Sequence, residues 1–159
     1  MLCPGAILEF KGEGPVFNLL SRLLKWKYPG WERWGWHVAM AVEYHPKRGW
    51  LIAEAVGQGV SFGWLDEKRE YRVWNWFDKA IPAIRIREKA ADLNRCSYDV
   101  FAYLWTALQI LIPAMPRIVD NSYTCWEFVA YMCRELGKPI QDLHRFPILP
   151  EMIERWQGS

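Results

Sequence analysis

Apolar and polar residues alternate in the early part of the chain, a pattern that is typical of β-strands. The stretch "GAILEF" (5–10) predicts a short strand, and "WGWHVAMAVEY" (34–44) predicts a longer one. The turn sequence "HPKRG" (45–49) separates this second strand from "WLIAEAV" (50–56). We therefore expect residues 34–56 to form a hairpin of two half-buried strands.

Glycine and proline interrupt the pattern after the hairpin. The glycines of "GQGVSFGW" (57–64) predict a turn, whereas "YRVWNWF" (71–77) and "AIPAIRIR" (80–87) predict two further strands. Pro82 lacks the N–H that a central strand would donate. We therefore expect the last of these strands to be bulged or to lie at an edge of the sheet.

Helical spacing appears in an early segment and again in the second half. Apolar residues in 15–27 form one face, which favours a packed helix, with a helix on a membrane surface as the alternative. The longest apolar stretch, 100–116, is too short and too interrupted by proline to span a membrane. Strands first and helices later indicate one α+β domain over residues 1–159, with an antiparallel sheet packed against helices.

The segment "TCWEFVAYMCRELGKP" (124–139) carries start and stop signals for a helix. Thr124 and Glu127 form the T-x-x-E pattern of a capping box, and a glycine and a proline mark the other end. Cys125 is then the first helical residue. Backbone N–H groups and the helix dipole stabilise a thiolate at this position.

Two roles are compatible with Cys125. It falls on the inward stripe of the helix, where a cysteine is commonly a buried packing residue. Cys133 lies further into the helix and is expected to be such a residue. A nucleophilic role for Cys125 requires a base close to it in the fold.

Charge and cysteine content narrow the classes of function. The net charge is +2 and the basic residues are scattered, so we expect no nucleic-acid partner. The four cysteines show no C-x-x-C and no histidine at zinc spacing, so we expect reduced thiols, no metal ion and no cofactor. The N-terminal "MLCPGAILEF" does not resemble a signal peptide, which makes the cytoplasm the default compartment.

Tryptophan is unusually frequent, with 11 residues. We expect most of these side chains to fill the core. An aromatic surface that stacks on sugars, bases or acyl chains is the alternative.

Among the three histidines, His37 is the candidate base. His45 lies in the expected turn and His144 in a proline-rich tail, so both are expected to be exposed. Strand alternation puts His37 on one face with Ala39 and Ala41, whose small side chains leave room for a helix end. A histidine on an apolar strand is also commonly structural, and the capped cysteine is what favours catalysis.

Glu54 is the candidate for orienting the His37 ring. A carboxylate among apolar neighbours is costly unless it has a partner. If paired residues of the hairpin have numbers with an odd sum, Glu54 lies on the His37 face; if the sum is even, its carboxylate reaches solvent. The sequence leaves the register open, and Glu43 and Gln58 are the alternative orienting residues.

Five segments together carry a resemblance to a known family: "GAILEFKGEGP", "WGWHVAMAVEY", "WLIAEAVGQGV", "YDVF" and "YTCWEFVAYMCRELG". They resemble the circularly permuted branch of the NlpC-like papain-fold hydrolases, the YiiX-type proteins. The resemblance implies a permuted papain-like topology in which the histidine strand comes first and the cysteine helix last. It puts Cys125, His37 and Glu54 in the roles of nucleophile, base and orienting acid.

Two positions depart from the family pattern. Ala6 stands where family members commonly have aspartate, and Trp126 follows the cysteine where a small hydroxyl residue is common. These departures concern the choice of substrate more than the fold. Tyr123 is a candidate second donor to an oxyanion, beside the Cys125 N–H, with loop packing as its alternative role.

The resemblance and the residues together imply a cysteine hydrolase or acyl-transfer enzyme that cleaves an amide or ester through an acyl-enzyme. A cell-wall peptide and a lipid-like acyl group are both conceivable substrates. The alternative function is a non-catalytic module of the same fold that binds a ligand in an aromatic cleft.

Overall fold

The computed structural model describes residues 1–11, 35–57, 59–93, 96 and 124–138, with isolated residues between 18 and 26 and between 105 and 112. Side chains are described from His37 onward in the second of these ranges. The helix expected over 15–27, the apolar stretch 100–116 and the C-terminal tail therefore lie largely outside the described residues.

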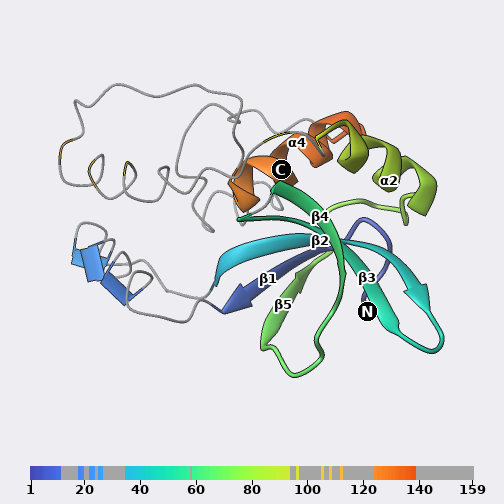
Figure 1. Ribbon diagram of the computed structural model, residues 1–159, viewed down its shortest axis with the longest axis horizontal. Helices are drawn as coiled ribbons and strands as arrows, with labels where there is room; N and C mark the ends of the chain where they lie inside the picture. The colour runs from blue at the N-terminus through green and yellow to red at the C-terminus, as the bar shows by residue number, and fades with distance from the viewer. Residues whose placement is uncertain are drawn as a thin grey trace.

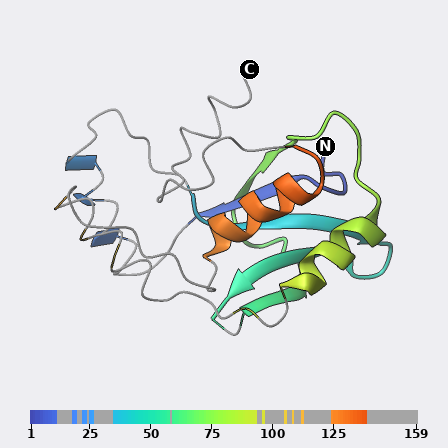
Figure 2. The same ribbon diagram turned by 90° about the horizontal axis from the view of Figure 1, so that it is seen from above.

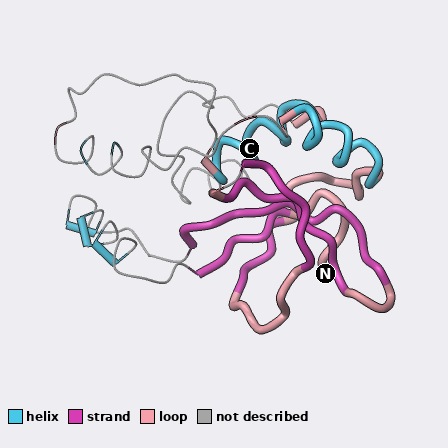
Figure 3. Tube along the Cα trace, in the orientation of Figure 1, coloured by secondary structure: helices cyan, strands magenta, loops and turns pink. Residues whose placement is uncertain are grey.

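The described part of the chain is an α+β structure in two layers. Five strands form one antiparallel sheet with the order β4-β3-β2-β1-β5. Two helices, α2 and α4, lie together on one side of this sheet (Figures 1, 2 and 3). The elements are β1 (Ile7–Lys11), β2 (Gly35–His45), β3 (Gly49–Val56), β4 (Gly59–Trp64), β5 (Tyr71–Trp74), α2 (Ala83–Asp92) and α4 (Cys125–Glu135). The expected α+β class with an antiparallel sheet is confirmed.

Each face of the sheet has its own hydrophobic cluster. The cluster beneath the helices contains Val38, Met40 and Val42 of β2 together with inward residues of α2 and α4. The cluster on the opposite face contains Ala39 and Ala41 and no residue of either helix. Side chains of β2 alternate between the two clusters, as the period of a strand requires.

Residues 57–64, expected to be a turn, form a second hairpin with β3. Only the tip of this segment turns, because Val56 pairs with Gly59 and the ladder continues to Leu51 and Trp64. Gly59 has a positive φ of 104°, a conformation that suits glycine. The expectation was wrong because the glycines favour a turn, whereas most of this segment is a strand that pairs with β3.

Residues 80–87 were expected to be a strand, but residues 83–87 form the first half of α2 instead. Pro82 is the N-cap of this helix, where its fixed φ and missing N–H do no harm. Ile86 and Ala90 are buried one turn apart, whereas Ile84 is 61% exposed. Ile84 and Ile86 stand two positions apart, as apolar residues do in a strand. The buried residues, Ile86 and Ala90, have the spacing of a helix.

The cysteine helix has the ends that the sequence predicts. Thr124 is the N-cap, and both hydrogen bonds of the capping box with Glu127 are present. At the other end Gly137 has a φ of 93°, and the Lys138 N–H donates to the Cys133 carbonyl at 2.9 Å. This is the pattern of a glycine-terminated helix. The capping residues therefore fix the position of Cys125 in the first turn.

Within the described residues, no helix is both long and apolar enough to cross a membrane.

Candidate active site

Cys125 opens α4 and is fully buried, with an exposed fraction of 0%. The Thr124 hydroxyl accepts a hydrogen bond from the Glu127 N–H at 3.2 Å, and the Glu127 carboxylate accepts one from the Thr124 N–H at 2.9 Å. These bonds use the N–H groups of the N-cap and of Glu127. The Cys125 N–H belongs to the first turn of the helix, and the positive end of a helix favours a bound anion.

His37 links the cysteine to an acid. Its Nε2 atom lies 2.6 Å from Oε2 of Glu54, and its side chain is also hydrogen-bonded to Cys125. Burial by itself lowers the pKa of His37, but the hydrogen bonds and charges of Cys125 and Glu54 outweigh burial and raise this pKa to about 9. Since Nε2 contacts Glu54, Nδ1 is the ring nitrogen left for the sulfur of Cys125. The site favours the imidazolium form.

Glu54 is the matching acid on β3. Burial raises its pKa, but the hydrogen bond with His37, the charge of His37 and the charge of Arg69 together lower it below its ordinary value. The side chains of His37 and Glu54 are 18% and 16% exposed, so this ion pair is largely shielded from solvent. Glu54 therefore stays ionised and can hold the ring in one orientation.

The register between β2 and β3 brings these two residues together. Ala39 is opposite Glu54, an odd sum, so Glu54 is the diagonal neighbour of His37 on the same face. Nearer the turn, Tyr44 is opposite Trp50, an even sum, and a β-bulge between Ala41 and Glu43 changes one register into the other. The half of the hairpin that lies away from the turn therefore has paired residues with an odd sum. This is the register that the assignment of Glu54 requires.

The expectation that a helix end packs above the two alanines of β2 is wrong. Ala39 and Ala41 belong to the cluster on the far side of the sheet, while Cys125 belongs to the cluster beneath the helices. His37 still reaches Cys125 because it lies close to the start of β2. The pairing of β1 with β2 also shifts register immediately before His37. Phe10 is opposite His37, whereas the next residue, Lys11, is opposite Gly35. Bulges of this kind bend a strand and redirect a neighbouring side chain.

The alternative orienting residue that the structure describes, Glu43, does not take the place of Glu54. Glu43 forms an ion pair with Arg87 of α2. The bulge explains this, since Glu43 follows Val42, which also faces the helices. Gln58 lies outside the described residues.

Two of the other expectations for histidine and cysteine are confirmed. His45 is exposed at the end of β2, whereas His144 lies outside the described residues. Cys133 is buried, and burial raises its pKa to about 12, which disfavours a thiolate. None of the four cysteines is in a disulfide.

The residues expected to shape the substrate site are described only in part. Tyr123 lies outside the described residues. Trp126 and Trp76 are buried among the helix-side residues, whereas Trp64 and Trp26 are exposed. Among the described tryptophans, some therefore fill the core and others do not.

Sequence reasoning did not identify Arg69 or Phe10 as neighbours of the site. The Arg69 guanidinium lies 4.1 Å from the centre of the Phe10 ring, which in turn lies 5.7 Å from the His37 ring. Arg69 comes from the loop between β4 and β5, and no local pattern relates it to His37. Among the described residues, no group of three or more His, Cys, Asp or Glu side chains could hold a metal ion.

Comparison with known families and with curated proteins adds no relative. No family model matches the sequence, and no curated protein matches it significantly. The geometry of Cys125, His37 and Glu54 is therefore the basis for any inference about function.

Proposed function

We propose that this chain is a cysteine hydrolase or acyltransferase with a circularly permuted papain-like fold. Cys125 is the nucleophile, His37 the base, and Glu54 the residue that orients the imidazole. The observation that carries this proposal is the chain of contacts from the Cys125 thiol at a helix start, through the His37 ring, to the Glu54 carboxylate.

Electrostatics supports the choice of nucleophile. The raised pKa of His37, about 9, means that the ring keeps a proton at neutral pH. Cys125 can give its proton to the ring and become a thiolate. The imidazolium and the positive end of α4 stabilise this thiolate. Such an ion pair is the resting state expected of an activated cysteine.

The reaction follows from these positions. The Cys125 thiolate attacks the carbonyl carbon of an amide or ester, so that a carbon–sulfur bond forms and the carbonyl electron pair moves to oxygen. The Cys125 N–H can donate to this oxyanion. The intermediate then collapses, the bond to the amine or alcohol breaks, and the leaving group takes a proton from the His37 imidazolium.

The second half of the reaction regenerates the enzyme. Neutral His37 removes a proton from water, or from an acceptor alcohol or amine, which attacks the thioester carbonyl. The carbon–sulfur bond breaks and releases an acid, or a transferred acyl group, and Cys125 recovers its thiolate. Glu54 keeps the same ring nitrogen pointed at its carboxylate through both halves.

The order of the elements also agrees with a permuted papain-like topology. The histidine strand β2 and the acid strand β3 precede the cysteine helix α4 in the chain. Catalytic groups of this kind are recognised by geometry and role and not by their order in the sequence. We propose an amide or ester of a cell-wall peptide or of an acyl lipid as the substrate class.

The test is to trap the acyl-enzyme. The protein is incubated with a panel of peptidoglycan fragments and phospholipids, and its intact mass is measured, with Cys125→Ser as the control. A mass increase of one acyl group on wild type that is absent from the variant supports the proposal. Ligand binding without any adduct, together with an unreactive Cys125, would identify a non-catalytic binding module instead.

A further inference from the structure

A row of rings crosses three neighbouring strands at the end of the sheet where β2 begins. His37 of β2 is directly opposite Phe10 of β1, and Phe10 is in turn directly opposite Tyr71 of β5. The ring centres of His37 and Phe10 are 5.7 Å apart, and those of Phe10 and Tyr71 are 6.0 Å apart. Directly opposite side chains lie on one face of a sheet. The proposed base is therefore the neighbour of Phe10, the central ring of this row.

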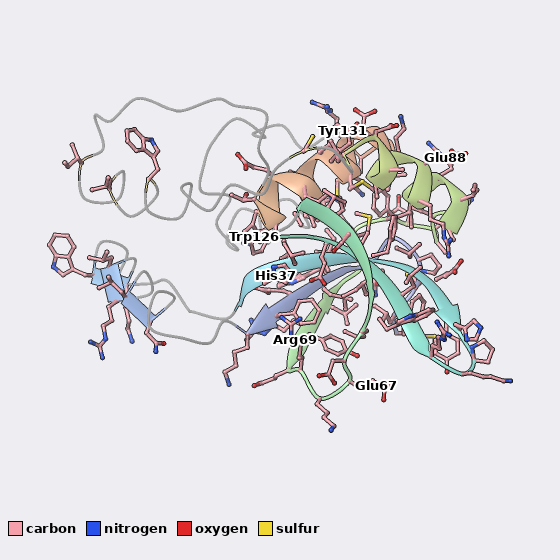
Figure 4. All side chains as sticks on the ribbon, in the orientation of Figure 1. His37, Glu67, Arg69, Glu88, Trp126 and Tyr131 are labelled. Carbon is pink, nitrogen blue, oxygen red and sulfur yellow. The ribbon has the colours of Figure 1, made fainter. Side chains whose placement is uncertain are left out.

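Phe10 is held firmly in its place. Its side chain is fully buried, with an exposed fraction of 0%, and belongs to the cluster on the face of the sheet away from the helices. The Arg69 guanidinium lies 4.1 Å from the centre of the Phe10 ring, a distance typical of a cation–π contact. Figure 4 shows Arg69 in the loop beneath the sheet and His37 on β2 above it. Burial and the contacts with Tyr71 and Arg69 leave the Phe10 ring little freedom to move.

The polar contacts of His37 do not fix the plane of its ring throughout the proposed reaction. Nε2 lies 2.6 Å from Oε2 of Glu54, which holds one corner of the imidazole. The ring can still turn about this hydrogen bond, because the final torsion of a histidine side chain is broad. The Cys125 thiol opposes such a turn at rest, but in the acyl-enzyme its sulfur is bonded to the acyl group. An immobile, flat neighbour beside the imidazole would restrict the turn in every state.

We propose that Phe10 is a positioning residue of this site: its ring, packed beside the His37 imidazole, keeps the imidazole plane in the orientation that directs Nδ1 to Cys125. This inference rests on the proposed function, because it assigns Phe10 to the same reaction. The two rings are tilted by 33°, closer to parallel than to perpendicular, at a distance that aromatic pairs commonly adopt. The Phe10 side chain has no polar atom, so it acts through His37 and not on the reacting atoms.

Two substitutions in β1 separate the position of the ring from core packing. Phe10→Leu keeps an apolar side chain beside His37 and removes the flat face. Leu8→Ala is the matched control, because Leu8 is also 0% exposed, belongs to the same cluster and is opposite Ala39 instead of His37. Both changes remove buried volume, so both should lower the free energy of unfolding. Urea unfolding measures the two decreases, and the variants are then compared under conditions in which both are folded.

The first readout is the motion of the His37 ring itself. Nuclear magnetic resonance relaxation dispersion on ¹³C-labelled imidazole detects exchange between ring orientations on the microsecond to millisecond timescale. We expect this exchange in Phe10→Leu, because the ring has lost the neighbour that restricts it. Wild type and Leu8→Ala should not show it.

The second readout is alkylation of Cys125 by iodoacetamide at neutral pH. Cys125 is 0% exposed, so a substitution that only loosens the core should leave this reaction unchanged or accelerate it. A misdirected imidazolium stabilises the thiolate less. Phe10→Leu should therefore slow the reaction, by up to about 10²-fold, the cost of a misplaced catalytic group.

Two outcomes would overturn the inference: equal alkylation rates in Phe10→Leu and Leu8→Ala, or a His37 ring that is as rigid in Phe10→Leu as in wild type. If Phe10→Leu does not fold, Phe10→Met provides the same readouts, because a methionine side chain adapts to irregular gaps in a core.

Acylation by p-nitrophenyl acetate distinguishes this inference from the proposed function. An acyl-enzyme on wild type, together with unchanged motion of His37 in Phe10→Leu, would overturn the role of Phe10 and leave the proposed function standing. No acyl-enzyme on wild type, together with a mobile His37 ring in Phe10→Leu, would overturn the proposed function and leave Phe10 as the residue that holds the imidazole.

Discussion

Glu54 and His37 meet diagonally across two neighbouring strands, with 2.6 Å between Oε2 of the acid and Nε2 of the ring. A diagonal pair can make this contact because both side chains are long and lie on one face of the sheet. The same ring is hydrogen-bonded to Cys125 of α4. A helix and two strands thus contribute one residue each to a continuous polar chain.

Cys125 is predicted to be the reactive thiol of the folded protein. It begins a capped helix and contacts His37, whereas burial raises the pKa of Cys133 to about 12. Brief alkylation at neutral pH followed by peptide mapping should label Cys125 before Cys133, Cys3 or Cys96. The Cys125→Ser protein should lose this fast-reacting site. Preferential labelling of another cysteine in the native state would contradict the assignment.

Replacing His37 by alanine should lower acylation by roughly 10²–10⁴-fold, the range typical of a general acid–base group. The thiolate also loses its counter-ion, so alkylation of Cys125 at neutral pH should slow as well. His45→Ala is the matched control, because His45 is exposed at the other end of β2. Activity that survives His37→Ala and disappears in His45→Ala or His144→Ala would show that another histidine is the base.

Glu54→Gln should reduce turnover without unfolding the protein, since the shape is kept and the charge is lost. Removing the carboxylate lowers the pKa of His37, so the imidazolium stabilises the thiolate less. The pH at which Cys125 becomes reactive should therefore rise, by roughly one unit. Glu43→Gln, which breaks the ion pair with Arg87, is the control and should leave this pH unchanged. Equal effects of the two variants would mean that Glu54 has no special relation to His37.

Stability should fall as the pH rises above neutral. The pKa of His37 is raised from 6.5 to about 9 in the folded protein, so protonated His37 stabilises the fold. This contribution is complete below pH 6.5 and is lost as the pH passes through about 9. Urea unfolding across this window should show a loss on the order of 1–3 kcal/mol. His37→Gln should flatten the dependence; an unchanged slope in that variant would assign the effect to other groups.

At acidic pH the dependence of stability on pH has the opposite sign, so that stability falls as the pH decreases. The pKa of Glu54 is lowered in the folded protein, so its contribution is present above its ordinary value of 4.5 and is lost as the pH falls. Wild type should therefore lose more stability than Glu54→Gln when the pH decreases through this region. Urea midpoints at a series of acidic pH values measure the difference.

Thr124→Ala should destabilise the start of α4, because the Glu127 N–H loses its acceptor. The expected decrease in the free energy of unfolding is about 1 kcal/mol. Alkylation of Cys125 should also slow, since the first turn no longer presents its N–H groups in a fixed geometry. Thr124→Ser keeps the hydroxyl and should restore both quantities. A failure of serine to restore them would indicate that the methyl group of Thr124, which is buried, matters more than the cap.

The sequence by itself determined the local features of this protein. The capping box at Thr124 and Glu127 and the glycine stop at Gly137 depend on hydrogen bonds between residues close in the chain, so the bounds of the cysteine helix could be predicted. The same holds for the strands that carry His37 and Glu54, whose patterns of apolar residues have the period of a strand.

Tertiary structure decided the features that depend on residues distant in the chain. Residues 83–92 form a helix that packs on the sheet and 59–64 a strand that pairs with β3, and these contacts decided between conformations where the local pattern was ambiguous. The bulge in β2 directs Glu43 to Arg87 and puts Glu54 beside His37. A bulge moves each side chain beyond it to the other face of the sheet, and its position is set by packing on both faces at once. For this reason the sequence supplied His37, Glu54 and Cys125 as candidates, and only the folded sheet and helix brought them into contact.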